Sequence, residues 1–140
     1  MVYIVYVSSA THPFSDHDLD RLVRVSRRNN EAAGITGMLL HRDGHFIQTL
    51  EGPPSAVYRA YARIRRDPRH RRLIRLVDRP TSVRQFAGQA MGFCNTDKLP
   101  AVDRRALNVF LSEPSVPSAA DARGGLVYKL LLDFRDSFAA

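Results

Sequence analysis

The stretch that decides the fold is ITGMLLHRDGHFIQTLEG, residues 35–52. It contains two strand-like apolar runs, residues 35–41 and 45–51, separated by Arg42-Asp43-Gly44. An Asp-Gly pair between apolar runs is a strong hairpin signal, because the tight turn needs backbone angles that these residues tolerate. We therefore expect two antiparallel strands that are neighbours in a sheet.

The segments before this hairpin predict a strand and a helix. Residues 2–7 are β-branched and aromatic, which is typical of a strand buried in a sheet. Ser15 is a suitable N-cap, apolar residues then recur at helical spacing, and Gly34 stops the pattern. We place this helix at residues 16–33.

The segments after the hairpin repeat the pattern. Gly52-Pro53-Pro54 starts a second amphipathic helix, and Asp67-Pro68 ends it. Residues 73–77 and 84–93 then have the character of two further strands. The order βαββαββ, with two helices on one face of a mostly antiparallel sheet, predicts an α+β fold of the ferredoxin-like sandwich type.

The character of the chain changes after Asn95. Residues 97–140 contain two amphipathic stretches, separated by a Ser/Pro-rich break at residues 112–120, and predict two additional C-terminal helices. Their apolar faces must be covered by the open face of the sheet or by another subunit. We divide the chain into a domain at residues 1–96 and a helical appendage at residues 97–140.

Composition limits the class of protein. The chain has 140 residues, of which 44% are hydrophobic, and this is enough for one core. No apolar run approaches the roughly 20 residues of a membrane span, and the first residues lack the pattern of a signal peptide. We expect a cytoplasmic protein that does not associate with membranes.

Three polar side chains stand where the pattern expects apolar ones. The buried stripe of the first helix continues at helical spacing to Asn30. Gln48 lies between Phe46 and Leu50 on one face of a strand. Tyr6 brings a hydroxyl into a strand that looks central. An unpartnered buried amide costs roughly 1 to 3 kcal/mol, so each amide needs either the protein's own backbone or a polar ligand.

Taken alone, Asn30 fits simple helix capping near Gly34. The coincidence of three such residues favours a site instead. Tyr6, Gln48 and Asn30, pointing into a cleft between two helices, would suit a planar heterocycle with donors and acceptors, such as the uracil-like edge of a flavin.

Several short motifs around these residues occur in a fixed order: Tyr6-Val7-Ser8, Ser26-Arg27-Arg28-Asn29-Asn30, Gly34-Ile35-Thr36-Gly37, Phe46-Ile47-Gln48-Thr49-Leu50-Glu51-Gly52, Asp67-Pro68-Arg69-His70, Arg84-Gln85-Phe86 and Met91-Gly92-Phe93. In this order they resemble the BLUF family of blue-light sensors using flavin, from the first strand to Phe93. The resemblance implies that family's ferredoxin-like fold. It also implies a photoreceptor that binds flavin and is not an enzyme.

The resemblance assigns roles by position. Tyr6 is implied to be the electron and proton donor to the excited flavin, Gln48 the switch, and Asn30 the residue that holds the carbonyl and imide edge; Met91 lies beside the switch. Further flavin contacts are implied at Ser26, Asn29, Asp67, Arg69 and His70. The implied signalling state is a stronger hydrogen bond to the flavin carbonyl and a red-shifted spectrum. FAD is the family's usual cofactor, with FMN or riboflavin as alternatives.

One position departs from the family's common pattern. Many members have tryptophan two residues before the methionine, whereas this chain has Gln89. Gln89 either hydrogen-bonds beside the switch glutamine or faces solvent.

Two other functions remain as alternatives. The net charge of +7 and the arginines of residues 63–84 are typical of a basic nucleic-acid-binding module. The stacking aromatics of such a module are missing, however, and alternate arginines from Arg71 to Arg79 fit a solvated sheet face. An acylphosphatase-type enzyme would need a glycine-rich phosphate loop, which does not follow the first strand. The histidines lack the spacing of a metal site.

The expected output is a contact with another protein. No effector segment follows the sensor in this chain, so we expect a downstream effector protein in trans. Apolar stripes on both terminal helices also predict a homo-oligomer.

Overall fold

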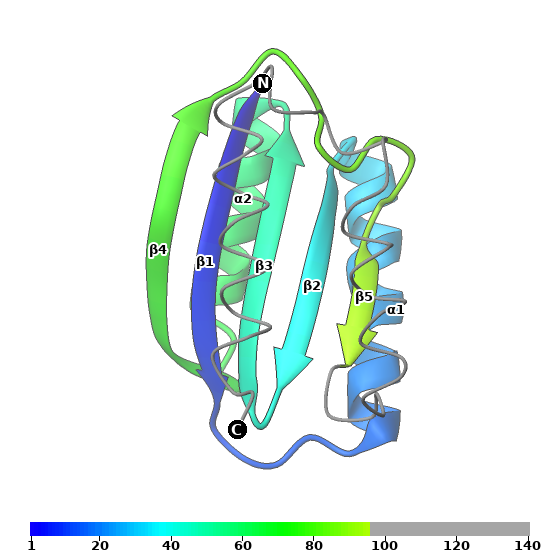
Figure 1. Ribbon diagram of the computed structural model, residues 1–140, viewed down its shortest axis with the longest axis vertical. Coiled ribbons are helices and arrows are strands. Elements are labelled where there is room, and N and C mark those ends of the chain that lie inside the picture. Colours follow the sequence, from blue (N-terminus) through cyan, green and yellow to red (C-terminus); the bar gives the residue numbers. More distant parts are fainter. Residues whose placement is uncertain (96–140) are drawn as a thin grey trace, which may run out of the picture.

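In the described part of the chain, two helices cover one face of a five-stranded sheet and form a two-layer sandwich (Figure 1). The computed structural model describes residues 1–95. Along the chain these residues form β1 (Val2–Ala10), α1 (Asp16–Ala33), β2 (Thr36–Arg42), β3 (His45–Gly52), α2 (Pro54–Arg65), β4 (His70–Pro80) and β5 (Gly92–Asn95). The strands lie in the order β4-β1-β3-β2-β5, and each neighbouring pair is antiparallel except β2 and β5. The predicted α+β, ferredoxin-like order βαββαββ is confirmed.

The predicted hairpin joins β2 to β3. Asp43 and Gly44 have φ values of 49° and 75°. Positive φ at both central residues is the type I′ arrangement, whose twist matches that of the flanking strands. The register set by this turn places Gln48 opposite Leu39 on β2, and β1 places Tyr6 on its other side.

Helix α1 begins and ends at the predicted residues. The Asp18 backbone N–H donates to Ser15 Oγ at 3.1 Å, and the Ser15 backbone N–H donates to the Asp18 carboxylate at 2.9 Å. This reciprocal pair is a capping box. At the other end Gly34 has a φ of 71°, and its N–H donates to the carbonyls of Asn30 and Glu31.

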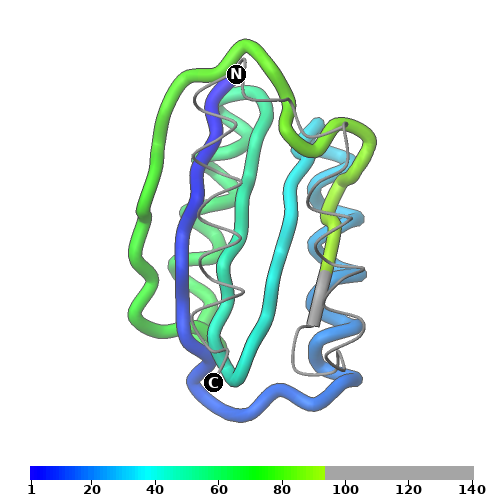
Figure 2. Tube along the Cα trace, viewed as in Figure 1, coloured from blue at the N-terminus to red at the C-terminus, as the bar shows by residue number. Residues whose placement is uncertain are grey.

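One predicted strand, residues 84–93, is wrong over most of its length. Residues 84–91 are irregular, and β5 covers only Gly92–Asn95 and pairs with β2 in parallel. The N–H groups of Gln85 and Phe86 donate to the Glu51 carboxylate at 2.7 Å each, so they cannot join a strand ladder. The segment crosses the end of the sheet from β4 to β5 (Figure 2).

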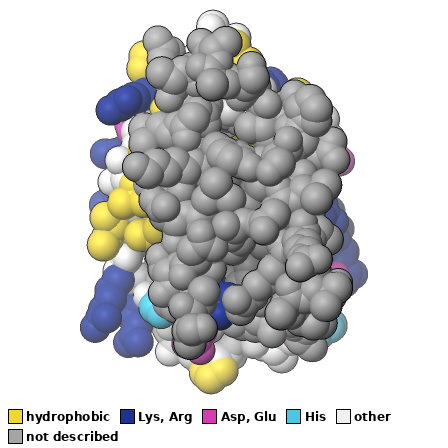
Figure 3. Space-filling model, viewed as in Figure 1, with side chains coloured by type: hydrophobic (Ala, Val, Ile, Leu, Met, Phe, Trp, Pro, Cys, Tyr) yellow, Lys and Arg dark blue, Asp and Glu magenta, His cyan; other side chains and the backbone are white. Residues whose placement is uncertain are grey.

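Strand β4 is longer than the predicted residues 73–77, because it pairs with β1 over most of its length. The pairing contains two register shifts, and Arg72 within it has a φ of 52°. Arg71, Arg75 and Arg79 are exposed, as predicted. Figure 3 shows basic side chains along the edge of the molecule where β4 lies.

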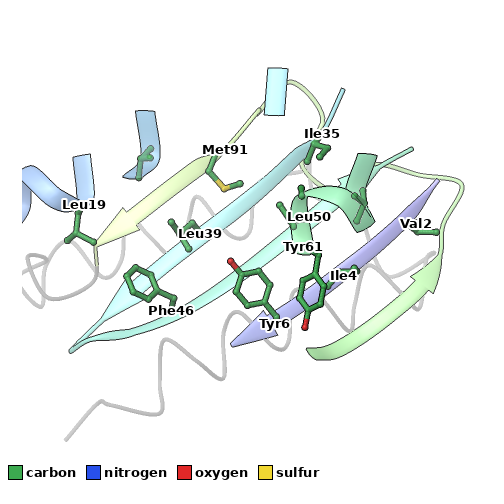
Figure 4. Packing of buried hydrophobic residues seen from close by; sticks show 13 residues of the cluster. Val2, Ile4, Tyr6, Leu19, Ile35, Leu39, Phe46, Leu50, Tyr61 and Met91 are labelled. Carbon is green, nitrogen blue, oxygen red and sulfur yellow. The ribbon is translucent and has the colours of Figure 1, made fainter. Parts of the chain in front are cut away.

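The core lies between the sheet and the helices. Tyr6, Leu39 and Met91 project from the same side of the sheet (Figure 4). The helices add apolar side chains such as Leu19 and Val57, which are 3% and 0% exposed. The core therefore forms on the face of the sheet on which the switch residues were predicted.

The predicted C-terminal helices lie outside the described residues, so the division into residues 1–96 and 97–140 stays a prediction. Within residues 1–95, no helix is both long enough and apolar enough to cross a membrane.

Candidate functional site

A pocket opens between α1 and α2, above the central strands. All eight side chains predicted to contact a cofactor line it: Tyr6, Ser26, Asn29, Asn30, Gln48, Asp67, Arg69 and His70. They come from β1, α1, β3, β4 and the turn that follows α2. The structure therefore brings the predicted residues together, while their roles toward a cofactor stay predictions.

The floor of the pocket is a pair of residues directly opposite each other on β1 and β3. The Tyr6 hydroxyl donates to Gln48 Oε1, and both side chains are buried. Burial raises the pKa of the Tyr6 phenol above its ordinary value, and the neighbouring Tyr61 and Asp67 raise it further. Tyr6 therefore keeps its proton and acts as a hydrogen-bond donor.

On its other side Gln48 contacts Met91, the residue before β5. Gln48 Nε2 donates to Met91 Sδ at 3.3 Å, and Met91 is 2% exposed. A thioether is a weak acceptor, so this bond is easily exchanged for a better one. The amide of Gln48 thus has a strong hydrogen-bond partner, Tyr6, on one side and a weak one, Met91, on the other.

Helix α1 holds the segment that carries Met91. Arg27 Nε donates to the Met91 carbonyl at 2.8 Å, and Asn30 Nδ2 donates to the Ala90 carbonyl at 2.7 Å. Asn30 therefore has a partner in the protein's own backbone, one of the two predicted alternatives. It also lines the pocket, as a ligand contact would require.

Gln89 fits neither predicted alternative. It does not line the pocket, and it is half-buried rather than exposed. Its Oε1 atom is buried beside Gly92 and Met38 and has no hydrogen-bond partner among the described residues. Its backbone carbonyl accepts from the Gly37 N–H at 3.0 Å, which ties the segment to β2.

The mouth of the pocket is charged. Arg69 Nε lies 3.0 and 3.1 Å from the two oxygens of Asp67. These bonds to Arg69 hold the pKa of Asp67 below its ordinary value. Burial lowers the pKa of His70, whose Nδ1 lies 3.2 Å from Ser8 Oγ. The mouth thus combines an ion pair with a neutral imidazole.

The walls of the pocket are mostly apolar, and their residues are not among those predicted for the site. They are formed by Leu22, Val25, Leu39, Leu50, Ala60, Ile64 and the aliphatic part of Arg63. Ala60 and Ile64 follow the helical spacing of apolar residues that predicted the second helix, so this spacing was the available signal. Arg63 carried no such signal.

Glu51 has a structural role that was not predicted from the sequence. It is fully buried on the face of β3 opposite to Gln48. Besides the N–H groups of Gln85 and Phe86, its carboxylate accepts from Thr36 Oγ1 at 2.8 Å, and Thr36 in turn accepts from Arg84 Nη1 at 2.9 Å. Burial raises the pKa of Glu51, although these hydrogen bonds oppose the shift.

The pocket suits a flat heterocycle with one polar edge. Its inner end presents a phenol and two amides, its walls are apolar, and its mouth is charged. Flavins have this distribution of groups, since the pyrimidine edge carries donors and acceptors and the benzenoid edge is apolar. By contrast, Tyr3, Tyr6 and Phe46 on the strands are all buried, so they are not available to stack on nucleic-acid bases.

Comparison with known proteins agrees with a flavin site. A family model described as sensors of blue-light using FAD matches residues 1–92. Photoactivated adenylate cyclase subunit beta of Euglena gracilis is 52% identical over 67 residues, which are 48% of this chain and 8% of that protein. Photoactivated adenylate cyclase subunit alpha-like protein FB of the same organism is 40% identical over 61% of this chain and 8% of its own length. The chain thus spans less than a tenth of these relatives.

Solved structures add to this similarity. BlrB, described as a BLUF protein in its dark state, is 33% identical with a TM-score of 0.67, over 81% of this chain and 86% of that one. Klebsiella pneumoniae BlrP1 with FMN and cyclic diGMP is 27% identical with a TM-score of 0.77, over 96% of this chain and 34% of that one. The family match includes every residue that lines the pocket.

Proposed function

Since this chain belongs to the BLUF family, sensors of blue light using FAD, we propose that it is a photoreceptor whose pocket holds a flavin and whose output is a rearranged hydrogen-bond network. The observation that carries the proposal is the amide of Gln48, which joins the buried Tyr6 hydroxyl to the Met91 thioether on the pocket floor. This amide has two distinguishable orientations, and their hydrogen-bond partners differ in strength.

The residues of the pocket divide the binding task. Tyr6, Gln48 and Asn30 would hold the polar edge of the flavin, and the apolar walls on α1 and α2 would enclose its rings, while Arg69 and His70 lie at the mouth. A bound flavin absorbs blue light and becomes an oxidant. Ser26, Asn29 and Asp67 complete the proposed contacts.

Tyr6 is the proposed electron donor. On giving an electron to the light-excited flavin, the Tyr6 phenol would become acidic, and Gln48 Oε1 is in place to accept its proton. Gln48 then rotates or tautomerises, giving up the weak bond to Met91. The electron and proton return to Tyr6, so no net redox change remains. The altered orientation of Gln48 is the signal.

The cofactor is proposed to be FAD, by the description of the family. The structure of BlrP1 with FMN supports FMN as an alternative, and the same ring contacts are available to riboflavin.

The output is proposed to pass to another protein. Adenylate cyclase subunits are among the relatives, and a protein bound to cyclic diGMP is among the structural neighbours, so related chains are associated with different signalling outputs. We propose an effector protein in trans, a homo-oligomer, and transmission through residues 97–140. A chain ending at residue 96 should keep the photocycle and lose light-dependent partner binding.

Absorption spectroscopy tests the central proposal. The purified protein should be yellow, and blue illumination should shift its spectrum reversibly to the red. Gln48→Leu should keep the flavin and lose the shift. Gln85→Leu is the matched control, because it removes the amide of another buried glutamine outside the pocket and should leave the shift intact. A shift that survives Gln48→Leu would overturn the assigned switch, and protein that binds no flavin would overturn the function.

A further inference from the structure

A second pocket adjoins the first along helix α1. It is lined by His12, Phe14, Asp18, Arg21, Val25 and Arg69. Val25 and Arg69 line both pockets, so the two adjoin at these side chains. Val25 is 45% exposed, which leaves an apolar step between the pockets.

We propose that this second pocket binds the phosphate-bearing tail of the flavin, so that the protein selects FMN and FAD over riboflavin. The inference rests on the proposed flavin site and extends it to a part of the ligand that the ring-binding residues do not contact. Its chemical basis is an anion recognised by arginine.

Arg21 supplies the available positive charge. It lies one helical turn before Val25 on the same face of α1. Within the described residues its guanidinium has no hydrogen-bond or ion-pair partner, whereas Arg24, on the next turn, is paired with Asp20. A phosphate at this place would therefore gain a partner without breaking an existing ion pair.

Arg69 reaches the same pocket from the opposite side. Its bonds to Asp67 use Nε and Nη2, so Nη1 is not engaged by that carboxylate. Arg63, on α2, lines the first pocket and is exposed. Three guanidinium groups thus surround the path of the tail, against the two carboxylates of Asp18 and Asp67.

The far wall of the second pocket is held in place by aromatic contacts. The rings of His12 and Phe14 stack with centroids 5.2 Å apart and planes 14° apart. Phe14 also packs edge-on against Phe46, at 5.4 Å, and lies 6.2 Å from His70. Since Phe46 belongs to the core and His70 to the first pocket, the wall is preformed relative to the ring site.

Asp18 limits how strongly an anion binds. Its carboxylate accepts from the Ser15 backbone N–H, and this bond holds the pKa of Asp18 below its ordinary value. It therefore stays charged at neutral pH and repels a phosphate. Removing this charge should strengthen the binding of phosphorylated flavins alone.

Titration of flavin-free protein with riboflavin, FMN and FAD tests the inference, with flavin fluorescence giving each dissociation constant. The wild type should bind FMN and FAD about fivefold more tightly than riboflavin, the size expected of an exposed ion pair. Arg21→Gln should remove most of this preference and leave riboflavin binding unchanged, while Asp18→Asn should increase it about twofold. About 0.5 M sodium chloride should weaken FMN binding and not riboflavin binding.

Arg24→Gln is the matched control, since it removes a paired arginine that lines neither pocket. Equal binding of riboflavin and FMN, or equal effects of Arg21→Gln and Arg24→Gln, would overturn the second pocket and leave the photoreceptor intact. Failure of riboflavin, FMN and FAD alike to bind would overturn the proposed function. The light-induced shift with riboflavin bound checks that each variant is folded.

Discussion

Gln48 and Glu51 are buried polar residues three positions apart on β3, and they point to opposite faces of the sheet. The carboxylate of Glu51 is held by two backbone N–H groups and the Thr36 hydroxyl. The amide of Gln48 has a phenol on one side and only a thioether on the other. One side chain is fixed by strong bonds, and the other keeps one weak bond that it can give up.

This difference separates an anchor from a switch. Glu51 fixes the irregular segment of residues 84–91, whose far end places Met91 against Gln48. A switch works only if its surroundings stay in place while it moves. The contrast predicts that changes at Glu51 affect stability, whereas changes around Gln48 affect mainly the photocycle.

The largest expected effect is that of Glu51→Ala. It leaves the N–H groups of Gln85 and Phe86 buried without an acceptor, at a cost of about 3 kcal/mol or more in the free energy of unfolding. Gln48→Ala should cost about 1 to 2 kcal/mol. Urea unfolding followed by circular dichroism measures both. Equal losses would remove the distinction between anchor and switch.

The next effect is a pH dependence of opposite sign in the two regions. Burial raises the pKa of Glu51 above its ordinary value of 4.5, so the folded protein binds this proton more readily than the unfolded chain does. The contribution of Glu51 to stability should therefore fall as pH rises upward from 4.5. Measuring the free energy of unfolding of the wild type and of Glu51→Gln across this range isolates the contribution of Glu51. The difference in stability in favour of the wild type should shrink as pH rises.

His70, at the pocket, should behave in the opposite way. Burial lowers its pKa below the ordinary 6.5, so protonation favours the unfolded chain. Stability should fall as pH drops through 6.5 toward the folded pKa, and His70→Gln should remove this dependence. Asp67 does not contribute to this dependence. Its pKa is lowered, so the stability that it contributes is lost only below pH 3.8. A His70→Gln profile parallel to that of the wild type would contradict this assignment.

The smallest expected change in stability is that of Met91→Leu. The two side chains have similar volumes, so the free energy of unfolding should fall by less than about 1.5 kcal/mol. The photocycle should change more, because Gln48 loses the acceptor that holds its dark orientation. Recovery in the dark after a blue pulse, followed by absorption, measures this effect. Unchanged recovery would show that Met91 only fills space.

The sequence predicted the parts of the molecule that depend on local pattern. The Asp43-Gly44 turn fixed the hairpin, Ser15 and Gly34 bounded α1, and strand alternation placed Gln48 and Tyr6 on one face. Each of these signals lies within a few residues of the element that it determines.

The parts that could not be predicted depend on contacts between distant segments. Residues 84–91 have strand-like composition, but the carboxylate of Glu51, more than 30 positions earlier, takes their N–H groups. Alternation along the chain cannot reveal such a competitor. The position of Gln89 beside Met38 depends on that same contact and on the bond to Gly37. The place of Arg63 in the pocket wall could not be predicted, because it depends on how α2 packs on the sheet.

The two register shifts between β1 and β4 have a consequence for association. Strand β4 is an edge of the sheet, and a straight edge strand offers free backbone groups to another chain. Here the shifts, the left-handed backbone at Arg72 and the exposed arginines make that edge uneven and positively charged. These features disfavour strand-to-strand addition at β4.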